Sequence, residues 1–401
     1  MKDKKQTLKQ IMAGFDKNEL VNILSALIKI PSHKKVEWQE NKLALYIYDL
    51  LLENDINEVK LDYIAENRPN IKAKIKGNGK GSSLMLNAHL DTIPPYNMII
   101  PPYEPIIKNG FIQGRGVVDM KGSMAAMLLA MILIKRSGIN LAGELSFTGV
   151  IDQEQRSLGA VKLVEDNFNA DYAIVGEATD LTICHAHKGM EWMKIIVKGK
   201  SAHGSTPEKG ANPIYQACRI AEEIDKFNQD LREKDNKLLG YPTINVGVIH
   251  GGNDPNIVPN VAYLEIDRRY TPDEKLEDIY EEIQRIITRL NTINPDFEVE
   301  LIPMDDRVCP LKNIPLLMDT DNNLVFSLLD NIKKFTDRDG KTSAFKGWSD
   351  AALFANKLGI TSVVFGPGLP QDAHVVDERL KIDDLIDAAR IYLATIIDIC
   401  Y

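Results

Sequence analysis

The sequence predicts an α/β fold in which a discontinuous main domain, with a mostly parallel sheet flanked by helices, carries an inserted β-α-β-β-α-β domain. The main evidence is a series of short apolar runs separated by helical segments, a pattern typical of buried parallel strands. These runs lie at residues 84–86, 145–147, 172–175 and 362–365, and residues 71–75 form a further strand-like segment in which apolar residues alternate with lysines.

The pattern changes between about residues 188 and 304. Strand-like segments at 192–197, 243–249, 262–266 and 297–301 alternate there with helix-like segments at 213–231 and 272–290. This order is that of a small β-α-β-β-α-β sandwich. The first pattern resumes after Pro310, so we expect one domain from 1–187 and 305–401 and an inserted domain from 188–304.

Helical periodicity accounts for most of the remaining apolar residues. It predicts helices at 20–30, 43–52, 324–335, 350–357 and 383–399. The most apolar segment, 124–134, lies between Lys121 and Lys135 and is shorter than the ~20 apolar residues of a membrane span. We expect it to be a buried helix.

Composition excludes some function classes. The 401 residues contain 48 Lys and Arg against 57 Asp and Glu, and this net charge of −9 argues against a nucleic-acid role. Residues 11–17 are too broken by polar side chains for a signal sequence. Four widely spaced cysteines, without a Cys-x-x-Cys pair, indicate free thiols and a cytoplasmic protein.

Histidine and acidic residues stand just after several predicted strands. His89, the stretch 152–154, Glu177 and Gly366 each follow one of the apolar runs. In open α/β sheets this edge is where ligands bind, so residues far apart in sequence can converge there. Asp91 lies two residues after His89, and we expect its carboxylate to accept the second ring N–H of that histidine.

A two-metal hydrolytic site needs imidazole and carboxylate ligands, one bridging group and a position open to water. Any single His or Glu after a strand is more often solvated or structural, but an ordered set of five favours a metal site. The chain supplies two terminal imidazoles, two capping carboxylates and a bridge, namely His89 and His374, Glu154 and Glu177, and Asp119.

Longer motifs surround these residues: His89-Leu90-Asp91, residues 114–122, Asp152-Gln153-Glu154, residues 176–180, 201–207 and 251–259, and residues 365–368 ahead of His374. With them the chain resembles, over nearly its whole length, the metal-dependent amidohydrolase and peptidase family of acetylornithine deacetylase, succinyl-diaminopimelate desuccinylase, aminoacylase and bacterial glutamate carboxypeptidase. The resemblance implies two divalent ions, Zn²⁺ foremost with Co²⁺ or Mn²⁺ as alternatives. Asp119 would bridge them, His89 and Glu177 would complete one, and Glu154 and His374 the other.

The resemblance also implies roles for the inserted domain, which in that family is a lid and dimerisation domain. His203 would reach the site of the other subunit of a homodimer and donate to the oxyanion. Asn256 and Arg269 would bind the substrate's carboxylate. The adjacent Arg268 is the alternative to Arg269, because strand alternation places the two side chains on opposite faces and only one of them can face the site. Gly366 would help to shape the pocket near His374.

Position 153 departs from the family. There the first of two adjacent glutamates is the general base, and the chain has Gln153, whose amide cannot accept the proton. Three accounts compete: an engineered Glu-to-Gln change that traps a complex, which the intact surrounding motifs favour; a natural non-catalytic relative; and rescue by Asp152 or another base.

The expected function is two-metal hydrolysis of the amide bond of an N-acyl amino acid, in a homodimer that binds neither nucleic acid nor membrane and whose turnover is largely lost through Gln153. A dipeptidase or carboxypeptidase is the alternative enzyme. A pseudoenzyme that binds an acylated amino acid is the alternative from another class.

Overall fold

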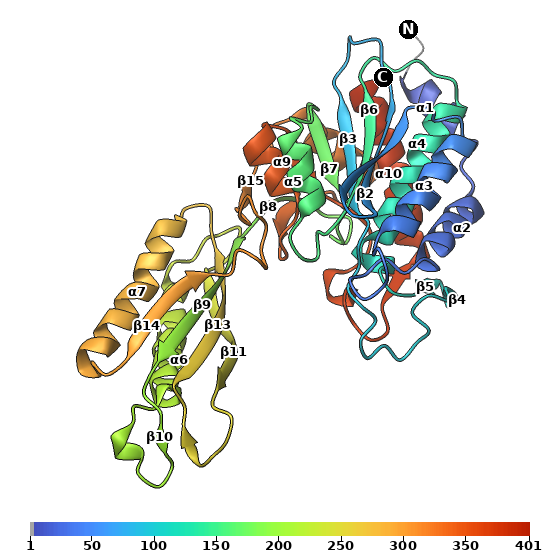
Figure 1. The fold of residues 1–401 in the computed structure, drawn as a ribbon. Helices are drawn as coiled ribbons and strands as arrows, with labels where there is room; N and C mark the ends of the chain where they lie inside the picture. The colour runs from blue at the N-terminus through green and yellow to red at the C-terminus, as the bar shows by residue number, and fades with distance from the viewer. Residues whose placement is uncertain (1–3) are drawn as a thin grey trace. The chain divides into compact units, whose positions relative to one another are not determined.

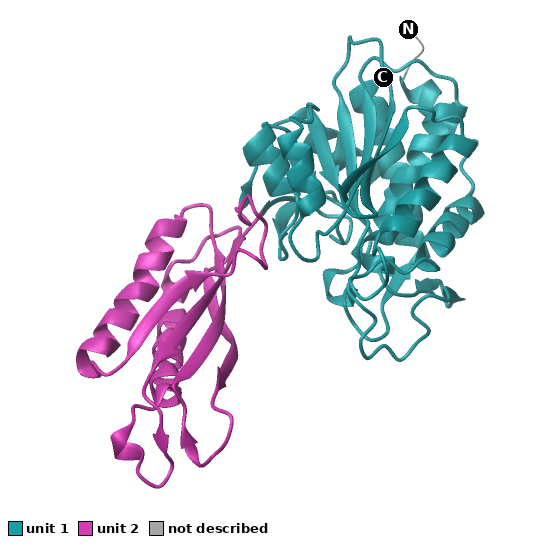
Figure 2. Cartoon of the chain, viewed as in Figure 1, with its two compact units in different colours: residues 1–186, 316–401 teal, residues 187–315 magenta. Residues whose placement is uncertain are grey.

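The computed structural model describes residues 4–401, which form two compact units (Figure 2). Unit 1 comprises Met1–Ala186 and Leu316–Tyr401, and unit 2 comprises His187–Pro315. The second boundary lies beyond the expected 304/305 because residues 305–315 remain attached to unit 2. Met190 forms a β-bridge with Asn313, whose carbonyl also accepts a hydrogen bond from the Tyr270 hydroxyl at 3.4 Å.

The main sheet of unit 1 is mixed, with parallel strands at its centre (Figure 1). β6 (Leu145–Val150), β3 (Leu84–His89), β7 (Tyr172–Val175) and β17 (Thr361–Val364) are parallel neighbours. The strands toward its edges are β1 (Val59–Ala65), β2 (Arg68–Ile75), β8 (Ile183–His187), β15 (Leu316–Leu317) and β16 (Thr342–Phe345). β1, β2 and β8 pair antiparallel to their neighbours, so the predicted α/β class is confirmed while the parallel part is confined to the centre.

Helices pack on both faces of this sheet (Figure 1). α5 (Leu158–Glu165) and α9 (Ala351–Leu358) cover one face, and α4 (Gly122–Arg136) and α10 (Ile382–Cys400) the other. Further helices are α1 (Lys4–Met12), α2 (Lys17–Ile28), α3 (Asn41–Glu53) and α8 (Asn323–Phe335). A small sheet of β4 (Ile106–Lys108), β5 (Phe111–Gln113) and β18 (Arg379–Lys381) completes the unit.

One helical stretch among the described residues, Val117–Arg136, is long and apolar enough to cross a membrane by length and composition. Its mean hydropathy is 1.8, and 94% of the apolar window is buried inside the protein. The stretch packs against α10 and α2, so its apolar surface is covered by other helices, as the sequence predicts for 124–134.

Unit 2 has the predicted β-α-β-β-α-β order. Its antiparallel sheet runs β11 (Thr243–Gly251), β13 (Val261–Tyr270), β9 (Gly189–Lys198) and β14 (Glu298–Pro303). α6 (Pro213–Asp230) and α7 (Leu276–Ile293) pack on the sheet around a buried core that includes Ile195, Ile220 and Ile283. α7 begins later than predicted, because Glu274 accepts the Thr271 N–H at 3.0 Å and closes a turn ahead of the helix.

Candidate metal centre

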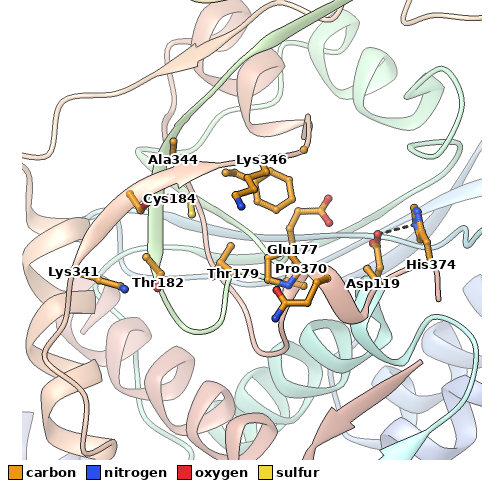
Figure 3. A pocket seen from close by; sticks show the side chains of 16 residues that line it. Asp119, Glu177, Thr179, Thr182, Cys184, Lys341, Ala344, Lys346, Pro370 and His374 are labelled. Carbon is orange, nitrogen blue, oxygen red and sulfur yellow. Dashed lines mark ion pairs between the residues drawn. The ribbon is translucent and has the colours of Figure 1, made fainter. Parts of the chain in front are cut away.

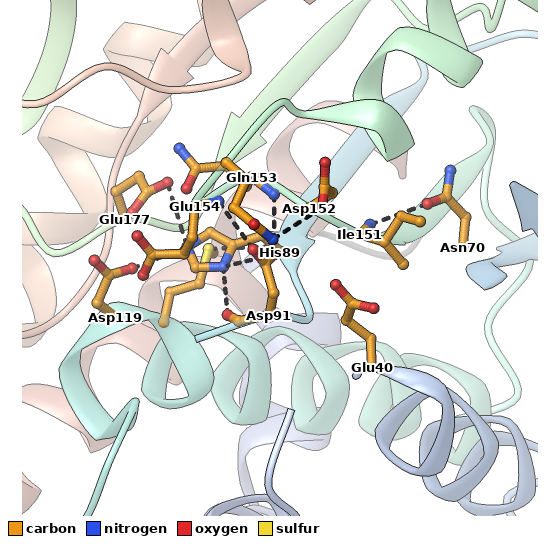
Figure 4. Close-up of polar contacts among 12 residues, drawn as sticks. Glu40, Asn70, His89, Asp91, Asp119, Ile151, Asp152, Gln153, Glu154 and Glu177 are labelled. Carbon is orange, nitrogen blue, oxygen red and sulfur yellow. Dashed lines mark hydrogen bonds and ion pairs between the residues drawn. The ribbon is translucent and has the colours of Figure 1, made fainter. Parts of the chain in front are cut away.

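The register of the parallel strands brings the predicted site residues to one edge of the main sheet. His89, the last residue of β3, pairs with Val150 of β6, and Asn87 pairs with Val175 of β7. The stretch 152–154 and Glu177 therefore begin beside the end of β3. Asp119 arrives from a tight turn that precedes α4, and His374 from the loop after β17 (Figures 3 and 4).

Asp119 lies at the centre of the cluster and contacts both histidines. Its Oδ1 is 2.9 Å from His89 Nε2, and its Oδ2 is 3.1 Å from His374 Nε2. Glu177 Oε1 lies 3.8 Å from His89 Nε2, and Glu154 Oε1 lies 3.0 Å from His374 Nε2. Each oxygen of Asp119 thus faces a different half of the cluster, which is the arrangement of a bridging carboxylate.

Two groups of ligand atoms share Asp119: His89, Asp119 and Glu177, and Asp119, Glu154 and His374. Within each group the ligand atoms all lie within 4.8 Å of one another. Nitrogen and oxygen ligands at ~2.0–2.2 Å around a tetrahedral zinc ion lie about 3.3 Å apart, so small side-chain adjustments would accommodate an ion in each group. Glu177 Oε1 is buried and has no hydrogen-bond partner within residues 4–401, as expected of an oxygen reserved for a cation.

The electrostatics of the cluster also favour a cation. Burial raises the pKa of Glu177 well above its usual range, and the neighbouring Asp119 raises it further. Burial also disfavours the charged form of Asp119, but hydrogen bonds from the two histidines outweigh it and hold its pKa below the usual range. Burial alone would lower the pKa of His374, yet hydrogen bonds to Asp119 and Glu154 raise it to about 11. Positive charge is therefore strongly stabilised between these carboxylates.

The turn that carries Asp119 is held by Glu378, a residue that the sequence analysis does not identify. The buried Glu378 carboxylate accepts backbone N–H bonds from Gly116 at 3.0 Å, Val118 at 2.9 Å and Asp119 at 3.3 Å. It also pairs with buried Arg115 at 2.7 Å. Gly116 has φ +79°, and a Cβ there would come within 2.5 Å of a Thr92 methyl carbon, so the turn requires glycine.

Asp91 supports the site differently from the expectation. The His89 Nδ1–H donates to the backbone carbonyl of Asp91 at 2.8 Å, whereas the Asp91 carboxylate is 3.6 Å away. That carboxylate instead accepts the backbone N–H groups of Gln153 at 3.0 Å and Glu154 at 2.9 Å. The carbonyl contact leaves His89 Nε2 free to ligate a metal, and the carboxylate positions the loop that carries Glu154 (Figure 4).

Asp152 and Gln153 are each held by a partner outside the metal cluster. Asp152 Oδ1 lies 2.8 Å from Nη2 of Arg68, which also pairs with buried Glu40 at 2.7 Å. Gln153 donates from its side-chain amide to the carbonyl of Trp348 at 3.3 Å. The Asp152 carboxylate is therefore engaged by a guanidinium that it shares with Glu40, away from the metal ligands.

A pocket of about 520 Å³ opens beside the cluster, and Asp119, Glu177 and His374 form part of its lining (Figure 3). Gly366, expected to shape this pocket, does not line it. Gly366 is buried, and a Cβ there would lie 2.5 Å from the Glu177 carbonyl oxygen. Its role is to let two backbone segments approach closely beneath Glu177.

The three remaining predicted residues lie in unit 2. His203 is exposed in the short strand Ala202–His203, and its Nδ1 is 2.7 Å from the Ser205 hydroxyl. The adjacent Gly204 N–H donates to the Asn256 carbonyl at 2.7 Å, so His203 and Asn256 are neighbours. Arg269 pairs with Asp267 at 2.9 Å and is partly exposed.

Of the two adjacent arginines in β13, only Arg269 is accessible. The Arg268 side chain is fully buried and pairs with Glu274 at 2.5 Å. The predicted alternation of the two side chains is therefore observed in the strand, and Arg268 has a structural partner inside unit 2.

The family to which this chain belongs follows from comparison with known protein families. Residues 85–398 match the model described as "Peptidase family M20/M25/M40". The chain belongs to this family. Its members are metallopeptidases and related hydrolases, which confirms the resemblance seen in the motifs.

Two curated relatives match almost end to end. An uncharacterised metallohydrolase of Methanocaldococcus jannaschii is 28% identical over 93% of this chain and 98% of its own length. A probable succinyl-diaminopimelate desuccinylase of Staphylococcus epidermidis is 26% identical over 95% of this chain and 98% of its own length. Among solved structures, aminopeptidase PepT from Bacillus cereus has a TM-score of 0.77 at 21% identity, covering 96% of this chain and 98% of that one. The last likeness supports the fold.

Proposed function

We propose that this protein is a two-metal hydrolase for the amide bond of an N-acyl amino acid, with turnover reduced by Gln153. The observation that carries the proposal is the pair of three-ligand groups that share Asp119 at the carboxyl edge of the parallel strands. When bound, two divalent cations polarise the amide carbonyl and lower the pKa of water at the site. His and carboxylate ligands suit Zn²⁺ best, with Co²⁺ or Mn²⁺ as substitutes.

Gln153 accounts for the reduced turnover. Its backbone is held by Asp91 beside Glu154, which supports the assignment of its side chain to the general-base position that the resemblance implies. An amide has hydrogen-bonding reach similar to a carboxylate but cannot take up the proton. General acid–base catalysis contributes typically ~10²–10⁴-fold, and binding of metal and substrate does not require it.

The substrate assignment follows the relatives. The desuccinylase among them is named for removing an acyl group from an amino acid, and the two matched chains align over nearly their full lengths. His203, Asn256 and Arg269 of unit 2 would complete the site in a homodimer. The free cysteines fit a reducing, cytoplasmic setting. A dipeptidase is the alternative, favoured by the peptidase description of the family.

Metal content and substrate preference test the proposal together. Zinc-loaded protein should hold two ions per chain, with fewer in Glu177→Gln and Glu154→Gln, and neither ion held tightly in Asp119→Asn. Circular dichroism would exclude unfolding as the cause. Amine release by a Gln153→Glu variant, measured across N-acyl amino acids and dipeptides, should favour blocked substrates.

Other outcomes separate the alternatives. A preference for free amino termini would assign a dipeptidase. Two bound zinc ions with no amine release from any substrate, even by the Gln153→Glu variant, would replace the hydrolase with a binding protein.

A further inference from the structure

The pocket beside the metal centre is lined by groups of two kinds. At one end lie the candidate ligands Asp119, Glu177 and His374, which belong to the centre itself. The wall away from them is formed by β16 with its flanking residues and by the segment that leads into β8. It contributes hydroxyls and two ammonium groups, from Thr179, Thr182, Ser343, Lys341 and Lys346 (Figure 3).

Pairing of β16 with β8 fixes where the two lysines stand. The Lys341 carbonyl accepts the Ile183 N–H at 3.2 Å, which places Lys341 beside β8, directly before the first residue of β16. Lys346 directly follows the last residue of β16 and lies two residues before Trp348, the partner of Gln153. Lys346 is therefore nearer in the chain to the reacting end, and Lys341 borders the remote end (Figure 3).

Neither lysine is neutralised by a carboxylate. Within residues 4–401, Lys341 and Lys346 form no ion pair at 4.0 Å or less. The acidic residues in the lining are Asp119 and Glu177, whose charge two divalent cations would more than balance. A chain with a net charge of −9 thus keeps two free cations on one pocket wall. Such a wall attracts an anion and disfavours a cationic ligand.

The rest of the wall offers no competing chemistry. Burial raises the pKa of Cys184 to about 12 although Lys341 lowers it slightly, so this thiol stays protonated and is not a nucleophile. The Ser343 hydroxyl can donate a hydrogen bond to a carboxylate oxygen, whereas the Thr179 hydroxyl already donates to the Gly366 carbonyl at 3.2 Å. A short acyl group of a few methylene groups that ends in a carboxylate therefore fits the charge and hydrogen-bonding groups of this wall.

From this wall we infer that the acyl group of the substrate carries its own negative charge, as in the half-amide of a dicarboxylic acid, and that Lys341 and Lys346 recognise it. This inference rests on the proposed hydrolase function and names the substrate class for the same site. The amino acid's own carboxylate is a second anionic group, and it is the one assigned to the residues of unit 2.

Binding to the zinc-loaded protein as it stands, with Gln153, tests the inference without turnover. Isothermal titration calorimetry would compare N-succinylglycine, which has both carboxylates, with N-methylsuccinamate, which has only the acyl carboxylate, and N-acetylglycine, which has only the other. Lys341→Met and Lys346→Met are the test variants. Lys357→Met is the control, because Lys357 is exposed on α9 and carries the same charge.

We expect one or both test variants to bind N-succinylglycine and N-methylsuccinamate with about tenfold lower affinity, because charge-assisted hydrogen bonds are lost from a partly exposed site. N-Acetylglycine and the Lys357 variant should show unchanged affinity. An equal loss of affinity for N-acetylglycine would assign the lysines to the carboxylate of the amino acid. Unchanged affinity for all ligands in both test variants would assign the lysines no role. Either result overturns the inference.

The two proposals fail in distinguishable ways. A Gln153→Glu variant that releases amine from N-acetylglycine, while binding of the succinyl ligands does not depend on the lysines, would overturn only the inference of an anionic acyl group. Lysine-dependent binding of N-methylsuccinamate without turnover of any substrate would leave the inference standing and remove the hydrolase.

Discussion

The side-chain amide of Gln153 donates a hydrogen bond to the backbone carbonyl of Trp348, with 3.3 Å between nitrogen and oxygen. An ionised glutamate in the same place has no proton to donate and would face the carbonyl oxygen with negative charge. The residue that suits catalysis and the residue that suits the local packing therefore differ at this position.

Gln153→Glu should therefore raise activity and lower stability. With zinc bound we expect kcat for the best N-acyl amino acid to rise by ~10²–10⁴-fold. The free energy of unfolding of the metal-free variant should fall by about 1 kcal/mol, because one hydrogen bond is lost. Steady-state amine release and urea denaturation measure the two effects. Gln284→Glu, the same change at an exposed position of α7, is the matched control and should leave kcat unchanged.

Asp152→Asn tests whether this neighbour replaces the missing base. Because Arg68 holds the Asp152 carboxylate at 2.8 Å, we expect any residual turnover to be retained. Arg68 would keep Glu40, and weakening one charged hydrogen bond should reduce the free energy of unfolding by about 1–3 kcal/mol. Loss of residual turnover with unchanged unfolding would identify Asp152 as the base and contradict the geometry.

Glu378→Gln should weaken metal binding without touching a metal ligand. Its carboxylate accepts three backbone N–H bonds from the turn that ends at Asp119. Loss of an outer-shell partner of this kind typically lowers metal affinity by ~10–100-fold. The variant also leaves buried Arg115 without an anionic partner, which costs roughly 3–5 kcal/mol when a buried pair is broken.

The double variant Arg115→Met with Glu378→Gln separates the two effects. It removes the unpaired charge, so stability should partly recover while zinc affinity, measured by chelator competition, stays low. Recovery of both together would mean that Glu378 acts only through Arg115.

Much of the site could be predicted because its residues follow from strand order. Parallel strands deliver their carboxyl ends to one edge, so His89 and Glu177 could be expected to meet from sequence alone. Other contacts depend on segments far apart in sequence. Glu378 reaches a turn about residue 117, and Arg68 reaches Asp152, across separations that no local pattern records.

Side-chain direction was also beyond the sequence. Asp91 was expected to hold His89 through its carboxylate, but that group turns toward the backbone of residues 153 and 154, and the carbonyl holds the ring. Both choices satisfy the same spacing, and only the course of the loop decides between them. Likewise, Lys341 and Lys346 belong to no motif until β16 places them on one wall.

Lys121 should make stability depend on pH. Its buried ammonium donates to the carbonyls of Leu27 at 2.9 Å and Ile30 at 2.7 Å, and burial lowers its pKa to about 7 although Glu378 opposes the shift. Between that value and 10.5 the unfolded chain binds a proton that the folded protein does not, so stability rises with pH. Relative to Lys121→Met, the free energy of unfolding should increase by up to about 1.4 kcal/mol per pH unit from pH 7.5 to 9.5. Urea denaturation at several pH values measures this difference. For Lys135→Met, an exposed change in the same segment, the difference in unfolding free energy should not vary with pH. A flat difference for Lys121→Met as well would show that the buried amine keeps its proton throughout.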